Sequence, residues 1–108
     1  MKKLIVVKTD FPAIHSWPKC DVPGVEFLQF PHRHIFFAVI KFEVSHNNRD
    51  IEFIDMKKKI NLYIKEKYYE KNLGAKSCEG IAEEIFNRFN AQYVSIFEDN
   101  ENGAEIYD

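Results

Sequence analysis

Two histidines separated by one residue, His32 and His34, are the first candidates for chemistry in this sequence. They lie at the start of an apolar stretch, residues 31–44, whose composition predicts one long β-strand. Because successive strand side chains alternate between the two faces, both imidazoles emerge on the same side, roughly 7 Å apart. Two imidazoles at this spacing can share one ion, so the pair predicts a metal site.

A site that holds zinc and leaves one position open for water or substrate needs a third ligand. Of the four histidines, only His15 and His46 remain. His46 lies on the order of 40 Å beyond His34 along the same extended chain, which excludes it within one subunit. His15 ends an earlier apolar segment, residues 11–15, and an adjacent strand would bring it beside His32. The predicted ligands of Zn²⁺ are therefore His15, His32 and His34, and the alternative is a chance pair of exposed histidines.

The composition indicates one globular domain, residues 1–108, because a hydrophobic content of 45% is enough for a single core. A net charge of -2 gives no electrostatic reason to expect a nucleic acid or an anionic membrane as partner. No apolar stretch approaches the length of a membrane span. Two cysteines form neither a metal motif nor a disulfide framework, so we expect a cytoplasmic location.

The elements that must position the histidines follow from periodicity and capping signals. Strands are predicted at residues 4–11, 31–44, 93–98 and 104–107, with a weakly alternating lead-in at 25–30 and a returning strand at 50–54. One helix is predicted over residues 56–70 with Asp55 as its N-cap, and a second begins after the N-cap Ser77 and runs to Phe89. The sequence thus predicts an α+β fold in the order strand, strand, helix, helix, strand, strand.

This order, with His15 closing an F-x-A-x-H segment and the H-x-H pair following, resembles the 6-pyruvoyltetrahydropterin synthase and 6-carboxytetrahydropterin synthase family. Residues 54–56 resemble the family's acidic step from strand to helix, residues 77–82 its P-T-A-E-N-L-A helix start, and residues 97–107 its closing strands. The resemblance covers nearly the whole chain. It implies the tunnelling fold, in which an antiparallel sheet with two helices packed on one face joins other subunits in an oligomeric barrel. We therefore expect a homo-oligomer, either a trimer or a pair of trimers.

The resemblance also implies a lyase reaction in pterin or queuosine and 7-deazapurine metabolism. Family members act on 7,8-dihydroneopterin triphosphate, and their zinc serves as a Lewis acid while a base removes a proton and triphosphate leaves. Glu98 matches the glutamate that anchors the pterin, a task that suits a carboxylate because it accepts two parallel hydrogen bonds. Ser77 and Glu79, at the matching helix start, are the other candidates for substrate binding.

Departures from the family concern the catalytic residues. The cysteine that usually precedes the histidine pair is absent, and counting back places Glu26 there, where partial desolvation by Phe27 and Phe30 would make its carboxylate a stronger base. Cys20 is a chemical substitute in a proline-bounded loop, and Glu70 stands where an Asp-His pair is expected. The candidate catalytic residues are therefore Glu26, Cys20 and Glu70. The alternative function is a catalytically silent relative that binds a pterin or purine.

Overall fold

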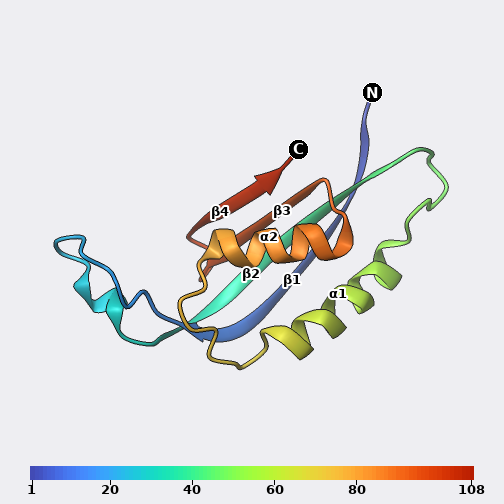
Figure 1. The fold of residues 1–108 in the computed structure, drawn as a ribbon. Helices are drawn as coiled ribbons and strands as arrows, with labels where there is room; N and C mark the ends of the chain where they lie inside the picture. Colours follow the sequence, from blue (N-terminus) through green and yellow to red (C-terminus); the bar gives the residue numbers. More distant parts are fainter.

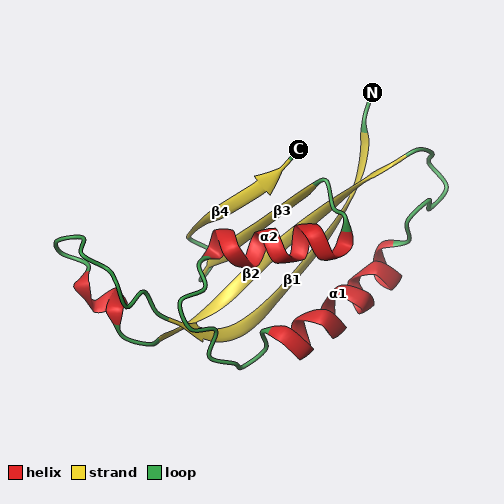
Figure 2. Cartoon of the chain, in the orientation of Figure 1, coloured by secondary structure: helices red, strands yellow, loops and turns green.

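Four antiparallel strands form one sheet in the order β1-β2-β3-β4 in this computed structural model, which describes residues 1–108. The elements follow one another as β1 (Lys3–His15), the short 3-10 helix η1 (Glu26–Gln29), β2 (His32–Val44), α1 (Phe53–Lys67), α2 (Cys78–Phe89), β3 (Tyr93–Glu98) and β4 (Asn102–Tyr107). Both helices lie on the same face of the sheet (Figure 1, Figure 2). The predicted α+β class and the predicted order of elements are confirmed.

The long antiparallel pair of β1 and β2 positions the histidines. The two strands stay in register from Lys3 opposite Val44 to His15 opposite His32. From Val7 onward, every second side chain of β1 except Thr9 is buried under the helices, as expected for a strand with one covered face. Because β1 ends at His15 where β2 begins at His32, the predicted approach of these two residues is confirmed.

The core lies between the sheet and the two helices. A cluster of 17 buried residues joins them, including Ile60 and Ile64 from α1 and Ile81 and Ile85 from α2. Fully burying one such side chain contributes about 1.5–3 kcal/mol, so these four residues supply much of the free energy that docks the helices. Neither helix is long and apolar enough to cross a lipid bilayer.

The segment between the two helices runs along β1 and extends its edge. The amide of Ile14 donates to the carbonyl of Lys71 (3.0 Å), and the carbonyl of Ile14 accepts from the amide of Leu73 (2.7 Å). Pro12 lacks an amide hydrogen, yet its carbonyl accepts from the amide of Glu70 (2.7 Å), and its place on β1, the first strand of the sheet order, suits a proline. This contact brings the residues before α2 next to the end of β1.

The predicted returning strand at residues 50–54 is wrong, because α1 already begins at Phe53. The N-cap is Glu52, whose carboxylate accepts hydrogen bonds from the amides of Ile54 (3.0 Å) and Asp55 (2.9 Å). Asp55 therefore lies inside the first turn rather than at the predicted cap. Residues 50–54 alternate in polarity like a strand, but they pair with no neighbouring strand. Their structure is set instead by Glu52, which accepts hydrogen bonds from the free amides at the start of α1.

The predicted strand-like lead-in at residues 25–30 is also wrong. This stretch contains η1, and the preceding Gly24 has a φ of 93°, a conformation that turns the chain away from an extended path. The amide of Gly24 donates to the carboxylate of Glu26 at 2.8 Å, which closes the turn. The weak alternation of apolar and polar residues over 25–30 therefore does not produce a strand, because the turn at Gly24 and Glu26 sets the local structure.

Candidate metal centre

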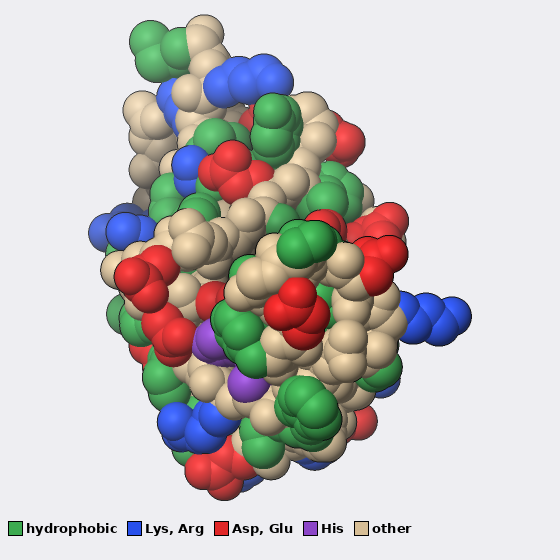
Figure 3. All heavy atoms as spheres, turned by 90° about the vertical axis from the view of Figure 1, so that its left-hand side faces the viewer, with side chains coloured by type: hydrophobic (Ala, Val, Ile, Leu, Met, Phe, Trp, Pro, Cys, Tyr) green, Lys and Arg blue, Asp and Glu red, His purple; other side chains and the backbone are tan.

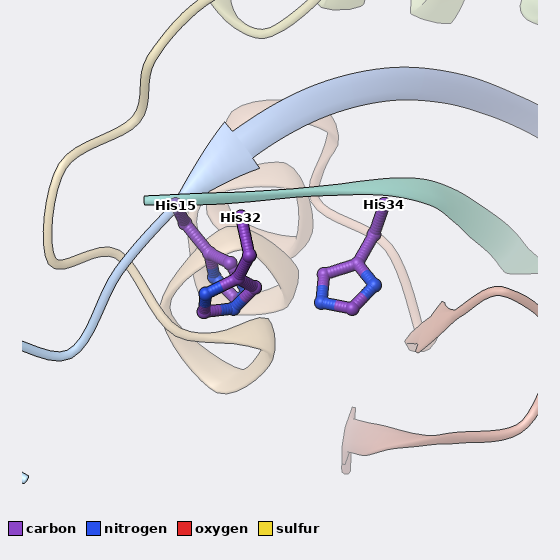
Figure 4. A group of neighbouring side chains, drawn as sticks. All are labelled: His15, His32 and His34. Atoms are coloured by element: carbon purple, nitrogen blue, oxygen red, sulfur yellow. The ribbon is translucent and has the colours of Figure 1, made fainter. Parts of the chain in front are cut away.

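Three imidazole rings meet where β1 ends and β2 begins. The ring centroids of His15 and His32 lie 4.5 Å apart, those of His32 and His34 4.9 Å apart, and those of His15 and His34 5.4 Å apart. Figure 4 shows all three side chains projecting from the same side of the two strands. One ligand atom from each ring lies within 4.8 Å of the others. The three predicted ligands are therefore close enough to share an ion.

Each ring directs its Nδ1 atom at an oxygen acceptor. The distances are His15 Nδ1 to the Lys76 carbonyl 2.8 Å, His32 Nδ1 to the Phe30 carbonyl 2.9 Å, and His34 Nδ1 to the Asp99 carboxylate 2.7 Å. Since these oxygens only accept hydrogen bonds, Nδ1 is the protonated nitrogen in each neutral ring. In this tautomer every Nε2 keeps a free lone pair, which is what a metal ligand needs.

The donor set fits zinc. His15 is 7% exposed, and its Nε2 is a buried polar atom without a hydrogen-bond partner, which is costly unless a ligand satisfies it. Phe36 lies edge-on against His15 and His34, with ring centroids 5.2 Å and 5.8 Å away, and gives the site an apolar floor. Three neutral imidazoles in a partly buried site are a common ligand set of catalytic zinc.

A carboxylate and a thiol lie beside the histidines. Oxygen atoms of Glu98 lie 3.0 Å from His15 Nε2 and 3.5 Å from His34 Nε2. The thiol of Cys78 donates to Glu98 Oε2 at 3.7 Å. Burial, followed by the negative charge of Glu98, raises the pKa of Cys78 to about 12, so this thiol is protonated at neutral pH. Cys78 is a core residue, and it also orients the Glu98 carboxylate.

A cavity of about 470 Å³ opens beside the histidines, within the range of small-molecule sites. Its walls come from the strand ends, the start of α2 and the loop after β1, and include His15, His32, Glu98, Ser77, Glu79 and Trp17. At this end of the molecule, imidazole side chains are visible between hydrophobic and acidic side chains (Figure 3). Three predicted substrate-binding residues, Ser77, Glu79 and Glu98, thus share one cavity.

The three candidate catalytic residues do not line this cavity. Cys20 is 2% exposed, and its thiol donates to the carbonyl of Val25 inside the loop. Glu70 is exposed beyond the end of α1. Glu26 is exposed on η1. Within one subunit, therefore, none of the three borders the cavity beside the histidines.

The desolvation predicted for Glu26 is wrong. The side chains of Phe27 and Phe30 are 65% and 67% exposed and do not shield the carboxylate of Glu26 from water. Hydrogen bonds from the amide of Gly24 and from its own amide lower the pKa of Glu26 below the usual range. Its carboxylate is therefore a weaker base than an ordinary glutamate, the opposite of the expected change.

Asp99 is a site residue that the sequence did not reveal. It follows β3 in a left-handed conformation (φ 52°), and its second carboxylate oxygen accepts from the amide of Ile35 at 3.0 Å. Hydrogen bonds from His34 and Ile35 lower the pKa of Asp99, so it is a carboxylate near neutral pH. In the sequence it is one of several acids in a turn, and only the register of β3 against β2 brings it to His34.

No protein-family model matches the chain, and no curated protein matches it. The function must therefore be argued from the chemistry of the site itself.

Proposed function

We propose that His15, His32 and His34 hold Zn²⁺ and that the protein is a lyase acting on 7,8-dihydroneopterin triphosphate, similar to 6-pyruvoyltetrahydropterin and 6-carboxytetrahydropterin synthases. The observation that carries this proposal is the cluster of three imidazoles, with one ligand atom from each within 4.8 Å of the others, beside a cavity whose wall includes His15, His32 and the carboxylate of Glu98. Bound zinc would supply Lewis-acid chemistry by polarising oxygens of the substrate's side chain.

The cavity supports a flat, polar heterocycle as substrate. Glu98 offers two acceptor oxygens, which suit the adjacent amino and ring N–H groups of a pterin. Trp17, on the cavity wall, adds an aromatic surface. Ser77 is already occupied as the N-cap of α2, where its hydroxyl accepts from the amide of Gly80 at 3.1 Å, so it would act mainly by fixing this wall.

The proposal includes a tunnelling fold assembled as a trimer or a pair of trimers. The face of the sheet opposite the helices carries the half-buried side chains of Ile35, Phe37 and Val39, together with Leu4 and Val6, which are 42% and 43% exposed. An uncovered apolar sheet face is a common site of subunit contact. A neighbouring subunit in such a barrel would also bring further side chains to each cavity, including a base.

A catalytically silent pterin- or purine-binding protein is the second candidate. It is favoured by the position of Cys20, Glu26 and Glu70 outside the cavity of one subunit. In this case Glu98 and the metal would hold the heterocycle, and no group would remove a proton from the substrate.

Metal content is the first test. The purified protein should contain about one zinc per chain by elemental analysis. His32→Ala and His34→Ala should each lose most of it, because two remaining imidazoles bind zinc weakly. His46→Ala is the matched control. His46 follows β2 at the end of the β1–β2 pair opposite to the three histidines, and it lies next to Asp50. Unchanged zinc in both site variants would show that the ligands are misassigned.

Incubation with 7,8-dihydroneopterin triphosphate separates the two candidates. Release of triphosphate, measured with and without trapping of acetaldehyde, is the expected result for a lyase. Binding of the pterin without triphosphate release would instead select the silent relative. A protein that binds zinc but no pterin would contradict both.

A further inference from the structure

The position of Glu98 is unexpected for a residue that only anchors a substrate. It ends β3, directly opposite Phe36 on β2, and its side chain lies on the helix-covered side of the sheet with the histidines. Its two oxygens divide between two rings, Oε2 at 3.0 Å from His15 Nε2 and Oε1 at 3.5 Å from His34 Nε2. The carboxylate therefore lies where an ion held by these rings would also contact it.

Hydrogen bonding cannot explain these two contacts while the rings are neutral. The Nδ1 protons of His15 and His34 are already donated to Lys76 and Asp99, so both Nε2 atoms present lone pairs. A carboxylate also presents only lone pairs, and acceptor atoms facing one another repel. A cation between them converts this repulsion into attraction on both sides.

The distances match two edges of a metal coordination sphere. Zinc bonds of about 2.0–2.1 Å to nitrogen and oxygen in a tetrahedral arrangement separate neighbouring ligand atoms by about 3.3 Å. The distances from Glu98 to the two Nε2 atoms, 3.0 Å and 3.5 Å, lie on either side of this value. The thiol of Cys78 contacts Oε2 and holds the carboxylate in this orientation.

The geometry points to Glu98 as the fourth ligand of the metal in the resting protein, displaced when a heterocycle binds. This inference rests on the proposed zinc site and adds a form of regulation to it. With Glu98 on the metal, no coordination position is open to water or substrate. A heterocycle that offers two N–H groups draws the carboxylate away, and this movement both anchors the ligand and opens the metal.

Metal affinity and the visible spectrum of bound Co²⁺ test this role without measuring turnover. Glu98→Gln keeps the size of the side chain but removes its charge, so the affinity for Zn²⁺ should fall by at least about 10-fold. Glu83→Gln is the matched control for metal affinity, because Glu83 is exposed on α2 and does not line the cavity. Its affinity for Zn²⁺ should equal that of the unmodified protein.

Added neopterin should shift the Co²⁺ spectrum of the unmodified protein, because it removes one ligand. The Glu98→Gln protein should show an altered spectrum before neopterin is added and no comparable shift afterwards. Glu98→Asp keeps the charge but shortens the reach, so it should also weaken the metal affinity and provides a second variant if Glu98→Gln folds poorly.

Unchanged metal affinity and unchanged Co²⁺ spectra in both Glu98 variants would overturn the inference while leaving the three-histidine site intact. If the unmodified protein binds neither Zn²⁺ nor Co²⁺, the proposed function fails together with it. The two failures are therefore distinguishable in one set of titrations.

Discussion

Single residues fix the chemistry of this site through their hydrogen bonds as much as through their identity. His15 and His32 are oriented by backbone carbonyls, which no substitution can remove. His34 is different because its partner is the side chain of Asp99. A carboxylate behind a ligating imidazole fixes the tautomer and makes the ring a stronger ligand. Asp99 is thus the one partner of the three rings that can be tested by substitution.

Asp99→Asn should lower the affinity for Zn²⁺ by about 10–100-fold, the usual effect of losing such a partner. The amide keeps the shape but has one oxygen to serve both the ring of His34 and the amide of Ile35. Isothermal titration with Zn²⁺ measures the change. Asp50→Asn is the matched control, because Asp50 likewise bonds a backbone amide and lies beside His46, far from the site. Equal affinities in both variants would contradict the role of Asp99.

At the scale of elements, the segment between α1 and α2 connects the core to the site. Tyr68, just after α1, is fully buried, and its hydroxyl donates to Glu84 on α2 at 2.7 Å. Lys76, whose carbonyl holds His15, also pairs with Glu84 at 3.0 Å. Glu84 therefore links both helices to the residue that orients His15.

Glu84 should make stability sensitive to acid. Partial burial raises the pKa of Glu84, but hydrogen bonds from Tyr68 and Lys76, together with the charges of Lys76 and Lys67, lower it more, so its pKa lies below the usual 4.5. A carboxyl whose pKa is lower in the folded state stabilises the protein above the unfolded-state pKa and loses this contribution as the pH falls through the folded-state value. The loss should therefore begin near pH 4.5 and continue below it.

Urea unfolding of Glu84→Gln at pH 7 and at successively lower pH measures this contribution. The variant should be less stable than the unmodified protein at pH 7, and the difference should shrink below about pH 4.5. Glu83→Gln, at the neighbouring exposed position, is the control and should follow the unmodified protein. A constant difference across this range would show that Glu84 is not responsible.

The molecule as a whole is elongated. Its dimensions are 50 × 27 × 21 Å, and its radius of gyration is 15.1 Å. A compact chain of this length has a radius of gyration of about 13 Å. The excess comes from the long pair of β1 and β2, which extends beyond the helices at one end, and from the loop with η1, which projects at the other end (Figure 1). One face of the sheet has no helix over it, so assembly would bury apolar surface that a monomer exposes.

Sedimentation velocity at micromolar concentration should therefore show a trimer or a pair of trimers. Phe37→Glu places a charge in the uncovered face and should shift the protein towards the monomer, because an unpaired charge is costly at an interface. Lys57→Glu, on the exposed side of α1, is the control and should leave the assembly unchanged. A monomer for the unmodified protein would count against the barrel.

The sequence by itself determined the parts that depend on local periodicity. The bounds of β3 and of α2 were predicted correctly, because a period of two or of three to four residues is set by the chain alone. The three histidines were also found, since few residue types bind zinc and only one further histidine lay within reach. The predictions for residues 25–30 and 50–54 failed where short alternation competed with hydrogen bonds to the side chains of Glu26 and Glu52.

Only the tertiary structure decided which partners surround the histidines. Asp99 reaches His34 because β3 pairs with β2 in one register, and Lys76 reaches His15 because the segment before α2 runs along the edge of β1. Such contacts join residues far apart in the chain and depend on how strands and loops pack. The position of Glu98 between two imidazoles has the same origin, because a strand-end acid carries no signal of what lies on the next strand.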